Sequence, residues 1–575
     1  MIMKRYMANI GAAAILACCA CGCIEETFPT TVATPEQIEK SSSSMEYMLS
    51  GLSSFFMDYD TWGDPANTND WGYPCQMYMR EVLGEDFPVY DAYYDYWSYE
   101  EAGTSLSYES YFTWYYYYSF IRNANNVIAL VPDPDNATVT AVHSLGQALG
   151  IRALMYMDLA AMFEYRKTEV SYLNEEAESS KIMGLTVPII LETTTSTELK
   201  NNPRAPFYTM YRFIMTDLNR AEEYLDGYEQ LTTANVDLGV VYGLKARLWL
   251  DMASRFDKDA SALADQKKVE GSEDGYDDLG INTATDCYAK AAEYAQKAIA
   301  RGYTPLTEDQ WMDSKTGFNT VQPSWILGTY VTSKEEVNTS YYYCSFVAQM
   351  TSEPTWSMAR YGSAFRCIGK SLYDKISDDD WRKASWIDPS DAGKTPIPSK
   401  YRTDLDAESW KELPAYANLK FRAGGGAESS IENGLIASLP LMRVEEMYFI
   451  YFEAIAHTQS VAAAASEMTD FINTYRYREG KYKCSASDMS SFITELMVQR
   501  RIEFWGEGIN FFAYKRLALP ITRSYTDTNY ISAHRLNTKA GYVAPWMNYY
   551  IPIYERDNNL AVILNPDASA SIISQ

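Results

Sequence analysis

Two segments of the chain, residues 149–163 and 242–256, repeat one another and are apolar around nearly the whole helical circumference. Their sequences, LGIRALMYMDLAAMF and YGLKARLWLDMASRF, share a glycine, two alanines, an aspartate and a phenylalanine when they are aligned without gaps. A helix that is apolar on all sides is stable only when other elements surround it. The small shared residues let a neighbouring helix pack closely. The repeat therefore predicts a scaffold of packed α-helices.

Amphipathic helices are expected on either side of the second buried segment and again near the C-terminus. Residues 213–225 precede that segment, and residues 287–302 follow it and end at Gly302, a residue type suited to a helix C-cap. Residues 443–457 and 465–480 form a further helical hairpin in this interpretation. The pairs resemble tetratricopeptide-type hairpins, although no strict period of about 34 residues holds. We expect a mainly α fold.

Two long stretches, residues 57–112 and 303–440, are rich in Trp, Tyr, Gly, Asp and Pro and lack sustained periodicity. Long irregular segments on a rigid scaffold usually carry function, and the aromatic content argues against disorder. We therefore expect the helical scaffold at about 113–302 and 440–520, within one domain over residues 41–575, and the ligand side in the two loop-rich stretches.

The first residues of the chain are typical of a secretory signal peptide. Lys4 and Arg5 precede an apolar stretch of small residues that ends in CCACGC at 18–23. A positive start, a short apolar run and small residues at its end describe such a signal, and the run is too short to cross a membrane. Cysteines this close cannot all aim thiolates at one tetrahedral ion, and a disulfide between them would be strained.

A cysteine at the end of such a run resembles the lipid-modified cysteine of bacterial lipoproteins. We favour Cys23, because the acidic pair after it resembles the surface-export signal of lipoproteins in the Bacteroidetes. Cys18, which follows Ile-Leu-Ala, is the alternative, and a plain secreted protein is the alternative to a lipoprotein. The expected boundaries are a signal peptide at 1–22 and an anchor and tether at 23–40.

Composition and motifs exclude several functions. A net charge of −27 argues against nucleic acid, which needs a Lys/Arg-rich surface. The three histidines have no HExxH spacing, and no GxSxG, P-loop or GxGxxG motif occurs. The acidic clusters at 273–278 and 378–380 lack the EF-hand pattern, so we expect turns there, no cofactor and no support for a structural calcium ion. The five scattered cysteines after Cys23 are expected to be small buried residues.

The segment QRRIEFWGEGINFFAYKR at 499–516 predicts two helices separated by a break, because each of its two glycines costs about 1 kcal/mol inside a helix. Glu503 and Glu507 are four residues apart, like a pair of catalytic carboxylates. We interpret them as structural and expect Glu503 to pair with Arg500 or Arg501, or to cap backbone groups.

Several motifs resemble those of the SusD/RagB family of outer-membrane nutrient-binding lipoproteins and occur in the same order. They look like the family's Tyr-rich helix, the helix after it, its Arg-Arg-Ile-Glu helix with a glycine break, and its closing Ile-Pro to Asn-Pro segment. The matching sequences are YYYYSFIRNANNVIAL at 115–130, GQALGIRALMYMDLAAMF at 146–163, residues 499–516, and IPIYERDNNLAVILNPD at 551–567. The resemblance covers essentially the whole chain after the signal.

This resemblance implies a SusD-like fold with tetratricopeptide-like hairpins and a lipid-anchored protein at the cell surface of the outer membrane. Such a protein binds an oligosaccharide without catalysis and passes it to a SusC-like TonB-dependent transporter. The family leaves alternatives open. Some relatives serve peptide uptake, and a surface glycoside hydrolase or a scaffold for surface enzymes would also fit the aromatic loops.

Aromatic side chains offer a flat apolar face on which a sugar ring stacks, with a polar group at the tip for tyrosine and tryptophan. The densest group is GEDFPVYDAYYDYWSYEE at 84–101, near the place where starch-binding relatives carry a Trp-rich ligand loop. Stretches 61–73 and 339–346 offer further aromatics for an opposite wall. The expected ligand contacts are Trp97, Tyr96, Tyr99, Tyr94, Asp86, Trp71 and Tyr342.

Overall fold

The computed structural model describes residues 42–57, 72–88, 103–105, 107–337, 339–340 and 342–572. Residues 1–48 form one unit, and residues 49–575, which hold every element after α3 (Ser42–Ser54), form the other. Cys23 and the expected tether lie outside the described residues. No helix in the described part of the chain is both long and apolar enough to cross a membrane.

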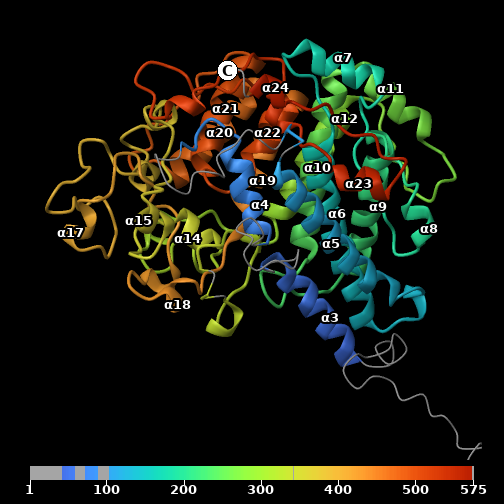
Figure 1. Cartoon of the computed structure of the whole chain (residues 1–575), viewed down its shortest axis with the longest axis horizontal. Coiled ribbons are helices and arrows are strands. Elements are labelled where there is room, and N and C mark those ends of the chain that lie inside the picture. The colour runs from blue at the N-terminus through green and yellow to red at the C-terminus, as the bar shows by residue number, and fades with distance from the viewer. Residues whose placement is uncertain are drawn as a thin grey trace, which may run out of the picture. The chain divides into compact units, whose positions relative to one another are not determined.

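A row of long helices builds the larger unit, and each helix packs against the next one along the chain (Figure 1). The row consists of α5 (Tyr108–Ala129), α6 (Val139–Phe163), α9 (Phe207–Tyr224), α10 (Leu238–Lys258), α12 (Ala284–Ile299) and α19 (Val444–Thr458). After it come α20 (Val461–Tyr475), α21 (Met489–Glu503) and α22 (Asn510–Leu517). The mainly α-helical scaffold is thereby confirmed, and the two repeated segments lie in α6 and α10.

The residues shared by the two repeats have matching roles in α6 and α10. Asp158 accepts a hydrogen bond from the hydroxyl of Tyr117 on the preceding helix α5, at 2.7 Å. Asp251 accepts one from Tyr211 on the preceding helix α9, at 2.5 Å. At Gly243, a Cβ atom would overlap the sulfur of Met442, so a larger residue there would require this methionine side chain to move. The two segments therefore resemble each other in their tertiary contacts as well as in their sequences.

Helix α4 (Tyr73–Val82) lies within the stretch at 57–112 that the sequence predicted to be loop-rich. All ten of its residues are buried. At ten residues, YPCQMYMREV is shorter than the window of about 11–18 residues over which a helical period is recognised. Its Arg80 pairs with Asp158 of α6 at 3.0 Å, which joins α4 to the helical row.

Some helix ends differ from the expected ones. α9 and α20 begin before the predicted starts, and Ser460 caps α20 by accepting a hydrogen bond from the third amide of the helix. α12 ends at Ile299, and Gly302 lies in the turn beyond it with a φ of 97°. α20 ends before Arg476, whose side chain turns inward to Glu503. Local sequence offers Ser460 as a helix N-cap but does not show the inward turn of Arg476.

The stretch at 303–440 contains short elements rather than open loops, and several of them lie at the left of Figure 1. Strand β1 (Trp325–Gly328) pairs antiparallel with β2 (Pro440–Arg443). The short helices here are α13 (Glu308–Met312), α14 (Phe346–Met350), α15 (Met358–Gly362), α16 (Lys370–Tyr373), α17 (Ala407–Trp410) and α18 (Ile431–Gly434). Separate small hydrophobic clusters around Trp410 and Trp356 hold this part together.

The remaining elements are short helices and 3₁₀ turns between these parts. The helices are α7 (Ser171–Ser179), α8 (Ser196–Leu199), α11 (Ala260–Val269), α23 (Ile553–Asn558) and α24 (Ser569–Ile572). The 3₁₀ turns are Phe55–Met57, Pro134–Asn136, Lys334–Glu336, Trp381–Ser385, Gly424–Gly426, Ser532–His534 and Pro545–Met547.

Glu503, the last residue of α21, is fully buried and accepts hydrogen bonds from three arginines. Arg476 donates through Nε and Nη2 at 2.8 and 2.9 Å, Arg382 through Nη1 at 2.8 Å, and Arg443 through Nη1 at 3.1 Å. Burial alone would raise the pKa of this carboxyl, but the three arginines hold the pKa of Glu503 far below its usual range. Arg443 also donates to Glu507 at 2.9 Å, so both carboxylates serve the core.

The expectation that Glu503 pairs with Arg500 or Arg501 was wrong. Residues two apart on a helix face different sides, so Arg501 points away from Glu503 and pairs with Asp86 instead. The partners of Glu503 come from three other segments, which the sequence around α21 does not reveal. The break between α21 and α22 is as predicted, with Gly508 at a φ of 70°.

The acidic stretch at 273–278 is more than a solvated turn. It surrounds Arg212, whose side chain is fully buried and pairs with Asp274 at 2.7 Å. The second acidic cluster behaves as a structural turn, because the carboxylate of Asp380 accepts from Arg382 at 2.6 Å. Both clusters thus neutralise buried arginines, and Arg212 comes from a segment 62 residues away from Asp274 in the sequence.

Replacing Glu503 by glutamine would leave three buried arginines without their shared counter-charge. We expect Glu503→Gln to lower the free energy of unfolding by about 3–5 kcal/mol, measured by denaturant titration. The control is Glu479→Gln, because the Glu479 side chain is 61% exposed and should tolerate the change within about 0.5 kcal/mol. A Glu503→Gln protein as stable as this control would contradict the role given to the arginines.

Glu81 on α4 is buried and accepts a hydrogen bond from the amide of Gly508 at 2.9 Å. Burial raises the pKa of Glu81 from 4.5 to about 7. The folded state then binds more protons than the unfolded state between these values, so this group's contribution to stability falls as pH rises through that window. We expect Glu81→Gln to raise the thermal midpoint relative to the wild type at pH 8 but not at pH 4. An equal effect at both pH values would contradict this assignment.

Candidate ligand-binding site

Residues 84–88, at the start of the aromatic stretch 84–101 that the sequence predicts to bind ligand, form the base of the candidate site. Both carboxylate oxygens of Asp86 accept from Arg501, each at 2.5 Å. The carbonyl oxygen of Asp86 accepts from the indole of Trp505 at 2.7 Å. These contacts tie the base to α21 and to the turn that follows it.

Glu85 is held as firmly as its neighbour Asp86. It pairs with Arg501 at 2.7 Å and accepts from the hydroxyl of Tyr514 on α22 at 2.8 Å and from the amide of Thr522 at 2.6 Å. Burial raises the pKa of Glu85, and Arg501 acts against this shift. One guanidinium therefore compensates two adjacent carboxylates at the base of the site.

A pocket of about 160 Å³ lies beside this base. Its walls are Pro88, Cys367, Ala415, Tyr416 and Asn529. The amide of Cys367 donates to the carbonyl of Pro88 at 3.2 Å, so the two walls are joined through the backbone. The pocket therefore opens where the chain enters the predicted aromatic stretch.

Tyr416 supplies the aromatic wall of this pocket. Its backbone has a φ of 69°, and its half-buried ring packs edge-on against Tyr373 with centroids 5.3 Å apart. Burial raises the pKa of Tyr416, so the hydroxyl stays neutral at physiological pH and can donate or accept a hydrogen bond. The amide of Asn529 is fixed nearby by bonds to the backbone of Lys370 and Ile368, each at 2.9 Å.

The Cys367 thiol in the wall of this pocket is not an activated nucleophile. Burial raises the pKa of Cys367 to about 12, so its thiol is protonated and is a poor nucleophile at neutral pH. All five cysteines of the described part are buried, as the sequence predicted. An aromatic face with neutral hydrogen-bonding groups fits a polyhydroxylated ring.

The structure describes only some of the residues that the sequence predicted as ligand contacts. Those outside the described residues are Trp97, Tyr96, Tyr99, Tyr94 and Trp71. Asp86 lies at the base, where Arg501 engages both of its oxygens. This geometry favours a structural role, and ligand contact by Asp86 stays a prediction.

Tyr342 belongs to a different cluster, in the part of the chain around α14. Its half-buried ring packs edge-on against Trp356 and Tyr343, with centroids 5.9 and 5.8 Å away. Its role as a ligand contact also stays a prediction. Sequence reasoning missed Tyr416 and Asn529, because each is a single residue in an irregular segment and only the fold brings them to Pro88.

Two family models match the chain. Residues 35–250 match a family described as starch-binding and associating with the outer membrane, and residues 379–564 match the SusD family. No curated protein matches the chain by sequence.

Solved structures share the fold across nearly the whole chain. A SusD-like carbohydrate binding protein from Bacteroides vulgatus is 19% identical and has a TM-score of 0.64, covering 91% of this chain and 97% of its own. A SusD superfamily protein from Bacteroides thetaiotaomicron is 16% identical, with a TM-score of 0.61 and coverages of 92% and 100%. Another from Parabacteroides distasonis is 17% identical, with a TM-score of 0.60 and coverages of 93% and 99%.

Replacing Arg501 by lysine tests whether the base depends on the fork geometry of one guanidinium. A lysine keeps the charge but cannot serve two carboxylates with parallel hydrogen bonds. We expect Arg501→Lys to lower the free energy of unfolding by about 1–3 kcal/mol and to speed amide hydrogen exchange at Gly369, which donates to the carbonyl of Asp86.

The matched control for this experiment is Arg478→Lys. Arg478 pairs with Glu308 at 2.8 Å, but its side chain is 46% exposed. Its replacement should change stability by less than about 0.5 kcal/mol. Equal effects of the two substitutions would show that the base does not rely on Arg501.

Proposed function

Because this chain belongs to the SusD/RagB family, we propose that it is a cell-surface lipoprotein that binds an oligosaccharide without transforming it. It then passes the bound glycan to a SusC-like TonB-dependent transporter of the outer membrane. Lipid on Cys23 holds it at the membrane in this proposal. The transporter is inferred from the family, and modest affinity suits a protein that must both capture and release its ligand.

The observation that carries this proposal is the pocket formed by Pro88, Tyr416 and Asn529. It combines one aromatic wall with a fixed amide, and it lies where the chain enters the stretch at 84–101 with its many Tyr and Trp residues. A sugar ring is recognised by such a pairing of an apolar face with hydrogen-bonding groups. One solved structure with the same fold is described as a carbohydrate binding protein.

The carboxylates next to the pocket support binding rather than glycoside hydrolysis. Hydrolysis needs two carboxyl groups that reach the scissile bond from opposite sides, about 5–9.5 Å apart. Glu85 and Asp86 are adjacent, and Arg501 engages both of them. Neither is placed to act as a free acid or nucleophile.

The sheet argues against one mode of peptide binding, the addition of a strand. Peptides that add a strand need an exposed sheet edge. Within the described residues, the sheet consists of β1 and β2, and every residue of both strands is buried. Peptide uptake stays the alternative function, and its test is included below.

Titration calorimetry of the purified mature chain against plant, host and microbial glycans tests the proposal. We expect one glycan class to bind and Tyr416→Ala to weaken that binding about tenfold, because the stacking face is lost. Trp97→Ala should weaken it as well if the stretch at 84–101 forms the opposite wall. The control is Tyr172→Ala, an exposed tyrosine on α7 in the helical part.

The possible outcomes of the titration distinguish the proposed function from its alternatives. Unchanged affinity in both Tyr416→Ala and Trp97→Ala would keep glycan binding but place it at another site, such as the cluster of Tyr342. Binding of peptides and of no glycan would replace the proposal by peptide uptake. New reducing ends after incubation with a glycan would show a hydrolase.

A further inference from the structure

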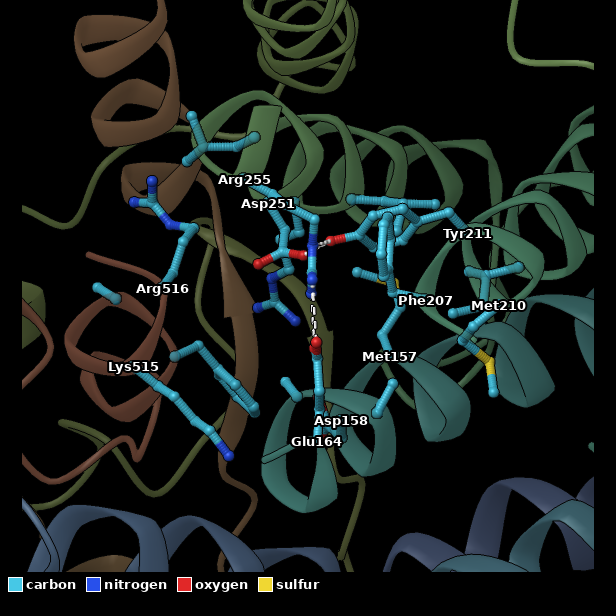
Figure 2. Close-up of a pocket in the computed structure, with 18 of the residues that line it drawn as sticks. Met157, Asp158, Glu164, Phe207, Met210, Tyr211, Asp251, Arg255, Lys515 and Arg516 are labelled. Atoms are coloured by element: carbon cyan, nitrogen blue, oxygen red, sulfur yellow. Dashed lines mark hydrogen bonds and ion pairs between the residues drawn. The ribbon is translucent and has the colours of Figure 1, made fainter. Parts of the chain in front are cut away.

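A second cavity, of about 120 Å³, lies among the long helices and is unrelated to the proposed glycan pocket. Helices α6, α9, α10, α19, α21 and α22 supply its walls, and Figure 2 shows side chains from several of them converging on it. The apolar wall includes Met157, Phe207, Met210, Ile214, Leu248 and Phe512. Arg166, with a side chain 28% exposed, gives one wall contact with solvent.

The cavity wall also carries more basic than acidic side chains. The six basic residues are Arg166, Arg247, Arg255, Arg500, Lys515 and Arg516, and the four acidic ones are Asp158, Glu164, Asp251 and Glu446. Buried charges normally require a partner of opposite sign, because desolvation makes an isolated charge unstable. The hydrogen bonds and ion pairs of each basic side chain therefore show which of these residues could still pair with a charged ligand.

Most of these cations are fully engaged. Arg255 makes two parallel bonds to Glu164, at 2.9 and 2.5 Å, as the dashed lines in Figure 2 indicate. Arg516 makes two bonds to Glu453, at 2.6 and 2.7 Å. Lys515 donates to two backbone carbonyls, at 2.8 and 2.9 Å.

Arg500 is the exception. The nearest carboxylate oxygen, on Glu446, is 3.8 Å from its Nη2, and Arg247 already holds that carboxylate through two bonds at 2.9 and 2.6 Å. The Nε of Arg500 is buried and has no hydrogen-bond partner among the described residues. Burial lowers the pKa of Arg500, the carboxylate of Glu446 partly offsets this shift, and the neighbouring charge of Arg516 lowers the pKa further. The cavity thus contains a guanidinium whose charge is poorly compensated.

We propose that this cavity binds a small monocarboxylate with a short hydrocarbon chain, whose carboxylate pairs with Arg500 and whose chain fills the apolar part. Asp251 and Glu446 line the same space and repel a second negative charge, which disfavours dicarboxylates and phosphate. A cavity of about 150 Å³ in another protein admits benzene, which has six heavy atoms. A space of about 120 Å³ therefore suits a carboxylate of about the size of butyrate.

The test is a thermal-shift and calorimetry series on the purified mature chain with formate, acetate, propionate, butyrate and hexanoate. Chloride, phosphate and succinate at equal ionic strength serve as reference anions. Affinity should rise about fourfold for each added methylene up to butyrate and should not rise further for hexanoate, which exceeds the cavity. An equal response to all anions, or no response, would overturn the proposal.

Two substitutions test whether the thermal-shift response to butyrate arises from binding in this cavity. Arg500→Met should abolish the butyrate response and leave the ligand-free thermal midpoint equal to or above that of the wild type, because a poorly compensated buried charge is removed. Ala160→Leu, on the cavity wall, should reduce butyrate binding much more than formate binding. The control Arg478→Met removes an exposed charge elsewhere and should keep the full response.

Retention of the butyrate response in both Arg500→Met and Ala160→Leu would place the ligand elsewhere and overturn the assignment. The result is independent of the glycan titration. Loss of glycan binding in Tyr416→Ala, with an unchanged butyrate response, would show that the two sites are separate.

Discussion

The rest of the structure depends on one buried carboxylate, Glu503, and the three arginines around it. Arg382, Arg443 and Arg476 come from the short elements of the loop-rich part, from the end of β2 and from the end of α20. A buried cation without a counter-charge is strongly unfavourable, so each of these segments is stable only when the others are in place. This coupling joins the helical scaffold to the loop-rich part of the chain at 303–440.

The same helix extends this support to the proposed ligand side. Arg501, two residues before Glu503, lies on another side of α21 and forms ion pairs with Glu85 and Asp86. The pocket of Tyr416 adjoins that base through Pro88. Arg500, the next residue back, faces the cavity between the helices. One turn of α21 thus contributes to the core, the proposed glycan pocket and the proposed carboxylate site.

Sequence reasoning found the helices that have a local signal. The repeated apolar segments became α6 and α10, and the glycine-containing stretch became the break between α21 and α22. It missed α4, because a helix of ten residues is too short to display a sustained period. It also misassigned the partners of Glu503 to adjacent arginines, because the true partners lie 27, 60 and 121 residues away in the sequence and leave no local pattern.

The sequence by itself determined the helical scaffold, the resemblance to the SusD/RagB family and the residue types expected in a sugar site. Periodicity and motif order are local properties, which a single chain displays directly. Only the tertiary structure decided that Tyr416 and Asn529 meet Pro88 and that the Nε of Arg500 has no hydrogen-bond partner among the described residues. Those facts depend on which distant segments share a space, and burial gives them their energetic weight, since a charge or an aromatic face matters most where water is excluded.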